Sequence, residues 1–162
     1  MKIVNGVELG TQLCMGIDEL KIINKVVNDR FIKPIGGFWT STFRNNSSDW
    51  LDWCTSNGGF SLQLGINKGI LLEVLPTAKI LVIDCVEDLR EVAKKYELKT
   101  VLLGSSFCCL DFEKIKDDFD GVNLTEKGQQ DTRFSHPSLY GWDCESTLWF
   151  RDVFKVVRNF EF

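Results

Sequence analysis

The stretch from Gly36 to Trp50, GGFWTSTFRNNSSDW, decides the fold that we expect. Its first half, GFWTSTF, predicts a short strand, and Ser47 or Ser48 can cap a short helix that runs through DWLDWC. Trp39 and Trp50 therefore stand on either side of a polar turn, eleven residues apart. A tryptophan beside a loop needs a surface on which to stack. What the two rings face is the central question of this sequence.

Composition indicates one globular domain over residues 1–162, with 44% hydrophobic and 26% charged residues. A net charge of −4 argues against a broad basic surface for duplex nucleic acid. The six cysteines form no C-x-x-C pair, the first residues lack a signal-peptide pattern, and no apolar run approaches the length of a membrane span. We therefore expect a cytoplasmic protein (host cytoplasm if the source is viral) with reduced thiols, no disulfide and no membrane partner.

Hydrophobic periodicity predicts helices early and strands late in the chain. The apolar spacing of residues 17–30 favours an amphipathic helix, and residues 86–96 and 111–119 favour two more. Strands are predicted at 69–75, 78–84, 99–103, 120–125, 146–150 and 153–162. This order favours an α+β domain over a doubly wound sheet.

Most familiar catalytic patterns are missing from the sequence. The single histidine, His136, has no Cys or His spacing around it that suits a metal, so no metal site is predicted. No glycine pattern matches a phosphate-binding loop, and the pair Cys108-Cys109 is interpreted as small apolar residues. The strongest feature is YGWDCESTLWF (140–150), in which Asp143 and Glu145 share one face of a predicted strand. A carboxylate where a buried strand begins is costly unless it is exposed or has a function.

These residues together resemble the ADP-ribosyltransferase superfamily, which transfers ADP-ribose from NAD. In its poly(ADP-ribose) polymerase and diphtheria-toxin branch, a Gly-x-Tyr strand is followed by a Ser-rich turn and a second tyrosine about eleven residues on. Here Gly37-Phe38-Trp39-Thr40-Ser41 stands at the first position and Trp50 at the second. Glu145, before an apolar strand, resembles the family's catalytic glutamate.

The resemblance implies two small packed β-sheets with flanking helices around a cleft for NAD, which is the substrate. It implies that Glu145 is catalytic and stabilises an oxocarbenium-like transition state. The other implied contacts are Gly10 and Thr11 with the adenosine end, Trp39 and Trp50 with nicotinamide, Thr40 and Ser41 with the ribose or amide, and Arg133 with the pyrophosphate or the acceptor.

The sequence departs from the family at its first motif, because Leu9-Gly10-Thr11 has leucine where the family has histidine. FWTST and Asp143-Cys144-Glu145 resemble motifs of the cholera-toxin-like branch instead, but no arginine precedes Arg30. The expected function is mono-ADP-ribosylation of a protein or nucleic acid, as in a toxin, a phage effector or a regulator. One alternative is an inactive module of the same fold that binds a nucleotide or a protein. Another is an interaction protein whose tryptophans belong to the core and whose Glu145 is solvated.

Overall fold

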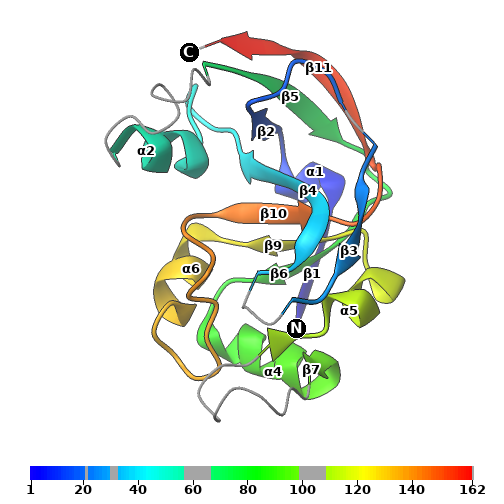
Figure 1. Cartoon of the computed structure of the whole chain (residues 1–162), viewed down its shortest axis with the longest axis vertical. Coiled ribbons are helices and arrows are strands. Elements are labelled where there is room, and N and C mark those ends of the chain that lie inside the picture. The colour runs from blue at the N-terminus through cyan, green and yellow to red at the C-terminus, as the bar shows by residue number, and fades with distance from the viewer. Residues whose placement is uncertain (21, 30–32, 57–66, 99–108, 162) are drawn as a thin grey trace.

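The computed structural model describes residues 1–20, 22–29, 33–56, 67–98 and 109–161 (Figure 1). The strands are β1 (Lys2–Asn5), β2 (Gln12–Met15), β3 (Asn24–Val27), β4 (Ile35–Thr42), β5 (Lys68–Val74), β6 (Lys79–Ile83), β7 (Glu97–Leu98), β8 (Cys109–Leu110), β9 (Gly121–Leu124), β10 (Ser146–Trp149) and β11 (Phe154–Glu161). The helices are α1 (Gly6–Leu9), α2 (Asp49–Ser56), α4 (Val86–Tyr96), α5 (Phe112–Asp118) and α6 (Glu126–Thr132).

Nine of these strands form one sheet in the order β1-β6-β9-β10-β4-β2-β5-β11, with β3 also paired to β4. Among the strands that the structure describes, only β6 and β9 pair in parallel. The protein is therefore α+β, as the sequence predicts, and its sheet is mostly antiparallel. The strand β4 joins two halves, because Phe38–Thr40 pair with β10 whereas Ser41 and Thr42 pair with β2. The sequence analysis expected two packed sheets, but these nine strands form one continuous sheet in which both halves pair with β4.

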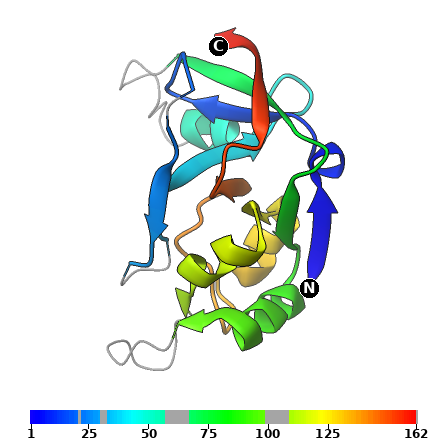
Figure 2. The same cartoon turned by 90° about the vertical axis from the view of Figure 1, so that its right-hand side faces the viewer.

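Alternating side chains divide the core into three layers. Leu81 and Ile83 of β6 pack with helices α4 and α5, whereas Ile80 and Val82 face the opposite side and pack with residues of β2 and β5. Leu13 of β2 packs with α2 in the third layer. Figures 1 and 2 show α4, α5 and α6 beside the half that contains β6, β9 and β10, and α2 beside the half that contains β2 and β5.

The predicted helix over 17–30 is wrong. Residues 24–27 form β3, which pairs antiparallel with the first part of β4. Ile23, Val26 and Val27 are β-branched, and such residues fit a pleated, half-buried surface better than a helix. Pairing with β4 therefore overrides the helical spacing of the apolar residues.

Gly36 and Gly37 lie inside β4. Both have positive φ, 81° and 69°. A Cβ atom on Gly36 would lie 2.3 Å from the carbonyl oxygen of Lys25, and one on Gly37 would lie 2.4 Å from Leu148 Cδ1. Only glycine allows β3 and β10 to approach β4 this closely.

Most of the other predicted elements are confirmed within a few residues. Ser48 caps α2, because its Oγ accepts a hydrogen bond from the Leu51 N–H (3.2 Å), and Asp111 caps α5 in the same way through Lys114 N–H (3.2 Å). The strand predicted at 99–103 lies outside the described residues. The sequence analysis missed β1, α1, β2, β7, β8 and α6.

Candidate functional site

Glu145 lies directly before β10, between β9 and β4, and its side chain is buried with 4% exposure. Its Oε2 accepts hydrogen bonds from Ser41 Oγ (2.7 Å) and the Thr42 backbone N–H (2.8 Å). Its Oε1 accepts hydrogen bonds from Thr42 Oγ1 and Asn123 Nδ2, both at 2.8 Å. Four donors replace the water that burial removes, and they suit the ionised carboxylate, which only accepts. The carboxylate is therefore held in one orientation.

A second shared network supports the strand β4 beneath this carboxylate. Thr40 Oγ1 donates to Gln12 Oε1 (2.7 Å) and accepts from the Trp149 indole N–H (2.8 Å). Gln12 Nε2 in turn donates to Thr42 Oγ1 (3.2 Å). Thr40 and Ser41 are both 0% exposed. Thr40 and Ser41, both predicted to contact the ligand, thus make hydrogen bonds inside the protein. Ser41 orients Glu145, and Thr40 connects β4 to Gln12 of β2 and Trp149 of β10.

The tryptophan cavity is a pocket of about 180 Å³ beside the start of β10. Trp39 of β4 and Trp50 of α2 both line it, so the structure brings together the two rings that the sequence singled out. Trp53 lies three residues after Trp50 on α2 and lines the same cavity. Its remaining lining residues are Lys33, Asp143, Cys144 and Ser146.

Trp39 makes two further contacts that define its environment. One edge packs against Trp142, with ring centroids 4.8 Å apart and planes at 68°. Lys33 Nζ lies 4.8 Å from the centre of the Trp39 ring. Burial raises the pKa of the neighbouring Cys144 thiol to about 11, so this thiol is neutral at pH 7. The charged groups that line the cavity are then Lys33 and Asp143.

The acidic cavity is a larger pocket of about 520 Å³ on the other side of Glu145. Burial raises the pKa of Asp49, and the nearby charges of Glu145 and Glu126 raise it further, whereas Arg44 lowers it. Five acidic and two basic side chains line this cavity, and they are Asp49, Asp52, Asp84, Glu126, Glu145, Arg44 and Lys127.

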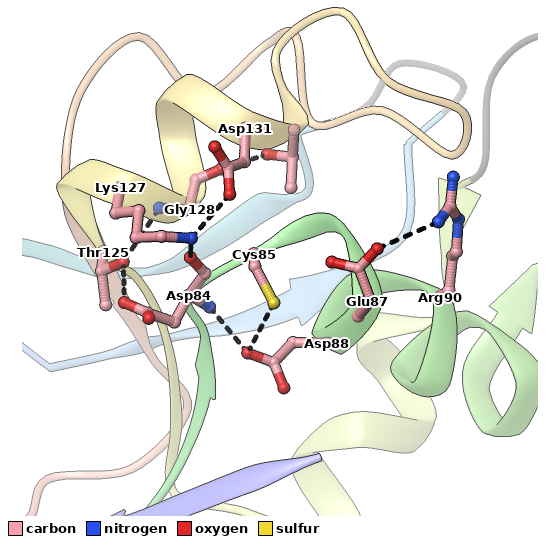
Figure 3. Close-up of polar contacts among 10 residues, drawn as sticks. Asp84, Cys85, Glu87, Asp88, Arg90, Thr125, Lys127, Gly128 and Asp131 are labelled. Atoms are coloured by element: carbon pink, nitrogen blue, oxygen red, sulfur yellow. Dashed lines mark hydrogen bonds and ion pairs between the residues drawn. The ribbon is translucent and has the colours of Figure 1, made fainter.

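One wall of the acidic cavity is built where the parallel strands β6 and β9 end (Figure 3). Thr125 Oγ1 donates to Asp84 Oδ1 (2.7 Å) and accepts from the Gly128 N–H (3.0 Å), which caps α6. Lys127 Nζ contacts Asp131 (2.7 Å) and the Asp84 carbonyl oxygen (3.2 Å). The positive charge of Lys127 is therefore balanced by Asp131, which does not line the cavity. The net charge of the lining residues stays negative.

Glu145 stands between the two cavities. It lines the acidic cavity, whereas its neighbours Cys144 and Ser146 line the tryptophan cavity. The Ser41 hydroxyl also connects the two, because it donates to Glu145 and accepts a long hydrogen bond from the Trp50 backbone N–H (3.4 Å). The position of α2, and with it Trp50, is thus coupled to the carboxylate.

The other predicted site residues lie elsewhere. Gly10 and Thr11 connect α1 to β2 and line neither cavity. Arg133 ends α6, and its guanidinium lies over the rings of Tyr140 (5.1 Å) and Phe134 (5.8 Å) rather than in either cavity. Their predicted roles toward NAD stay predictions.

The sequence analysis missed several residues of the site. Trp53 was readable, since a helix predicted over DWLDWC places it on the same face as Trp50. The sequence around Asn123 and Lys33 has no pattern that predicts a site. Both residues come close to the other site residues only in the folded chain. Cys14, Cys54, Cys85 and Cys144 are free thiols, and Cys108 lies outside the described residues.

Comparisons with protein-family models, curated proteins and solved structures found no match to this chain. Any function must therefore be argued from the geometry of the site itself. Among the described residues, no group of three or more His, Cys, Asp or Glu is arranged to hold a metal ion. Within the same part of the chain, no helix is both long and apolar enough to cross a bilayer.

Proposed function

We propose that the protein is an NAD-dependent mono-ADP-ribosyltransferase with an ADP-ribosyltransferase-like fold and that Glu145 is its catalytic carboxylate. One observation carries the proposal: a buried carboxylate, oriented by four hydrogen bonds, lines an acidic cavity, and its chain neighbours on both sides line a cavity of tryptophans. A fixed negative charge in a poorly hydrated site stabilises positive charge that develops beside it. Cleavage of a glycosidic bond to a pyridinium develops such a charge.

In the proposed reaction, the bond between ribose C1′ and the nicotinamide nitrogen breaks. Its electron pair leaves with the ring, which becomes neutral, and the positive charge moves to C1′ and the ribose ring oxygen. The carboxylate of Glu145 stabilises this cation. A nucleophile of the acceptor then bonds to C1′ and releases a proton, so that ADP-ribose is transferred.

The two cavities differ in size as this reaction requires. About 180 Å³ is below the range for a drug-sized ligand and suits one small ring, such as nicotinamide between Trp39 and Trp50. The acidic cavity of about 520 Å³ suits ribose hydroxyls and a cationic or neutral acceptor group. Its carboxylates repel a pyrophosphate, so we expect the adenosine half of NAD to bind outside it.

The test is release of free nicotinamide from NAD by the full chain. We expect Glu145→Gln to lower the rate by about 10²–10³-fold, the typical loss for a group that stabilises transition-state charge, while NAD affinity changes far less. Glu161→Gln on β11 is the matched control, since Glu161 is exposed and far along the sheet from β10. Unchanged turnover in Glu145→Gln would remove this residue from catalysis.

A second candidate is a module of the same fold that binds a nucleotide or a protein without catalysis. It is favoured by the saturation of Glu145: a carboxylate has about four acceptor positions, and protein donors fill them all. A ribose hydroxyl would have to replace one of these bonds. Thermal stabilisation by NAD or ADP-ribose without nicotinamide release would support this candidate.

A further inference from the structure

The tryptophan cavity already has a cation of the protein's own beside it. Lys33 Nζ lies 4.8 Å from the centre of the Trp39 ring, which is within the distance at which a ring face attracts positive charge. The Lys33 side chain is exposed and its ammonium group is strongly hydrated. This contact indicates that the cavity attracts positive charge. Because the ammonium group is exposed and hydrated, another cation can replace it at the Trp39 ring.

The walls of the cavity suit a cation that has no hydrogen to donate. Three indole rings line it, from Trp39 on β4 and from Trp50 and Trp53 on α2, and each is only half-buried. Aromatic faces attract a quaternary nitrogen without needing hydrogen-bond acceptors. The Asp143 carboxylate supplies the one negative charge among the lining groups, because the Cys144 thiol and the Ser146 hydroxyl are neutral.

We propose that the tryptophan cavity binds an organic cation whose nitrogen carries only carbon substituents, and that the ligand displaces the Lys33 ammonium from Trp39. Without Lys33, the lining groups carry a net negative charge from Asp143, so the cavity then favours the cation that replaces it. The ligand is an N-alkylpyridinium or a trimethylammonium group, two sources of the same chemistry.

The inference deepens the proposed function and rests on it for placing the pyridinium of NAD in this cavity. The substrate ring is cationic, whereas the nicotinamide that leaves is neutral. The cavity therefore holds the substrate more tightly than the product, and the return of Lys33 to Trp39 promotes release of the product.

The experiment compares two ligands that differ by one N-methyl group and the positive charge that it creates: 1-methylnicotinamide, a cation, and neutral nicotinamide. Each is titrated into the full chain and followed by tryptophan fluorescence and calorimetry. We expect the cation to bind roughly tenfold more tightly. Equal affinity for the two ligands would overturn the inference.

Variants test the two named interactions. Lys33→Met keeps most of the length of the side chain and removes its charge, so it should tighten binding of the cation about threefold to tenfold. Lys155→Met on β11, an exposed lysine of the other sheet half, should leave binding unchanged. Trp53→Leu should weaken binding of the cation roughly tenfold, with a thermal melt to show that the chain is folded. Unchanged or weaker binding of the cation to Lys33→Met would show that the ligand does not displace the Lys33 ammonium from Trp39.

Tetramethylammonium separates the two sources of the ligand. If it competes with 1-methylnicotinamide, the cavity accepts a trimethylammonium group; if only the pyridinium binds, the ligand is planar; and if neither binds, the inference fails. The result is also independent of catalysis. Cation-selective binding without NAD cleavage would overturn the proposed function alone, whereas NAD cleavage without charge selectivity would overturn this inference alone.

Discussion

The tryptophan cavity and the acidic cavity both border the segment that enters β10, but the interactions among their lining residues differ: apolar packing in the first and repulsion between carboxylates in the second. Trp50 and Trp53 pack against the apolar layer beneath α2, so the first cavity is part of a hydrophobic core that remains open on one side. The acidic cavity gathers carboxylates, and the pKa of Asp49 is raised first by burial and then by repulsion from Glu145 and Glu126. The first should therefore stabilise the fold, and the second should destabilise it.

This difference has a meaning for function. Natural proteins keep destabilising arrangements mainly where they serve a site. A leaving ring needs an aromatic surface, and a developing cation needs negative charge nearby. Glu145 lines the acidic cavity and its chain neighbours line the tryptophan cavity, so a single site formed from both cavities would include this carboxylate.

Removing the shared carboxylate should have the largest effect. Glu145→Leu leaves four donors from Ser41, Thr42 and Asn123 without an acceptor in a buried place, and we expect a loss of about 3–5 kcal/mol in the free energy of unfolding. Urea unfolding followed by fluorescence measures it. Glu145→Gln should lose less, because the Asn123 amide can flip to offer its oxygen. A loss below 1 kcal/mol in Glu145→Leu would mean that the donors find water and that the two cavities are joined by solvent.

The sequence predicts some parts of this arrangement and not others. The helix α2, its Ser48 cap and the start of β10 were predicted because their signals are local. The partners of Glu145 were not, since Ser41 lies 104 positions away in the chain and Asn123 reaches the carboxylate from β9. The strand β3 was mistaken for a helix because its pairing with β4 cannot be read from apolar spacing.

The aromatic side of the comparison can be tested by truncation. Trp53→Ala removes a half-buried indole that packs on the apolar layer, and we expect a loss of about 1–3 kcal/mol, less than for a fully buried tryptophan. The loss should be the same in 50 mM and 1 M salt, because apolar packing involves no net charge. Strong salt dependence would show that Trp53 acts through a charged neighbour instead.

The smallest expected effect is on the acidic side, at Asp49. Its pKa is raised by burial first and by Glu145 and Glu126 next, so the folded protein binds this proton more tightly than the unfolded chain does. Stability therefore falls as the pH rises from the ordinary value of 3.8 through the raised folded pKa, and the loss persists at pH 7. Asp49→Asn removes the charge and should raise the free energy of unfolding at pH 7 by about a few tenths of a kcal/mol, since solvent screens this open site.

The same variant should show almost no gain at pH 3, where Asp49 is mostly protonated in both states. In 1 M salt at pH 7 the part of the gain that comes from charge repulsion should shrink, unlike the loss in Trp53→Ala, because salt screens charges at the open side of the cavity. Asp117→Asn on α5 is the control, since its carboxylate is exposed and lines neither cavity. If Asp49→Asn destabilises the protein at pH 7, the Asp49 carboxylate makes a favourable contact that outweighs the repulsion. The acidic cavity would then be an ordinary stabilised surface, and its contrast with the tryptophan cavity would no longer indicate a site.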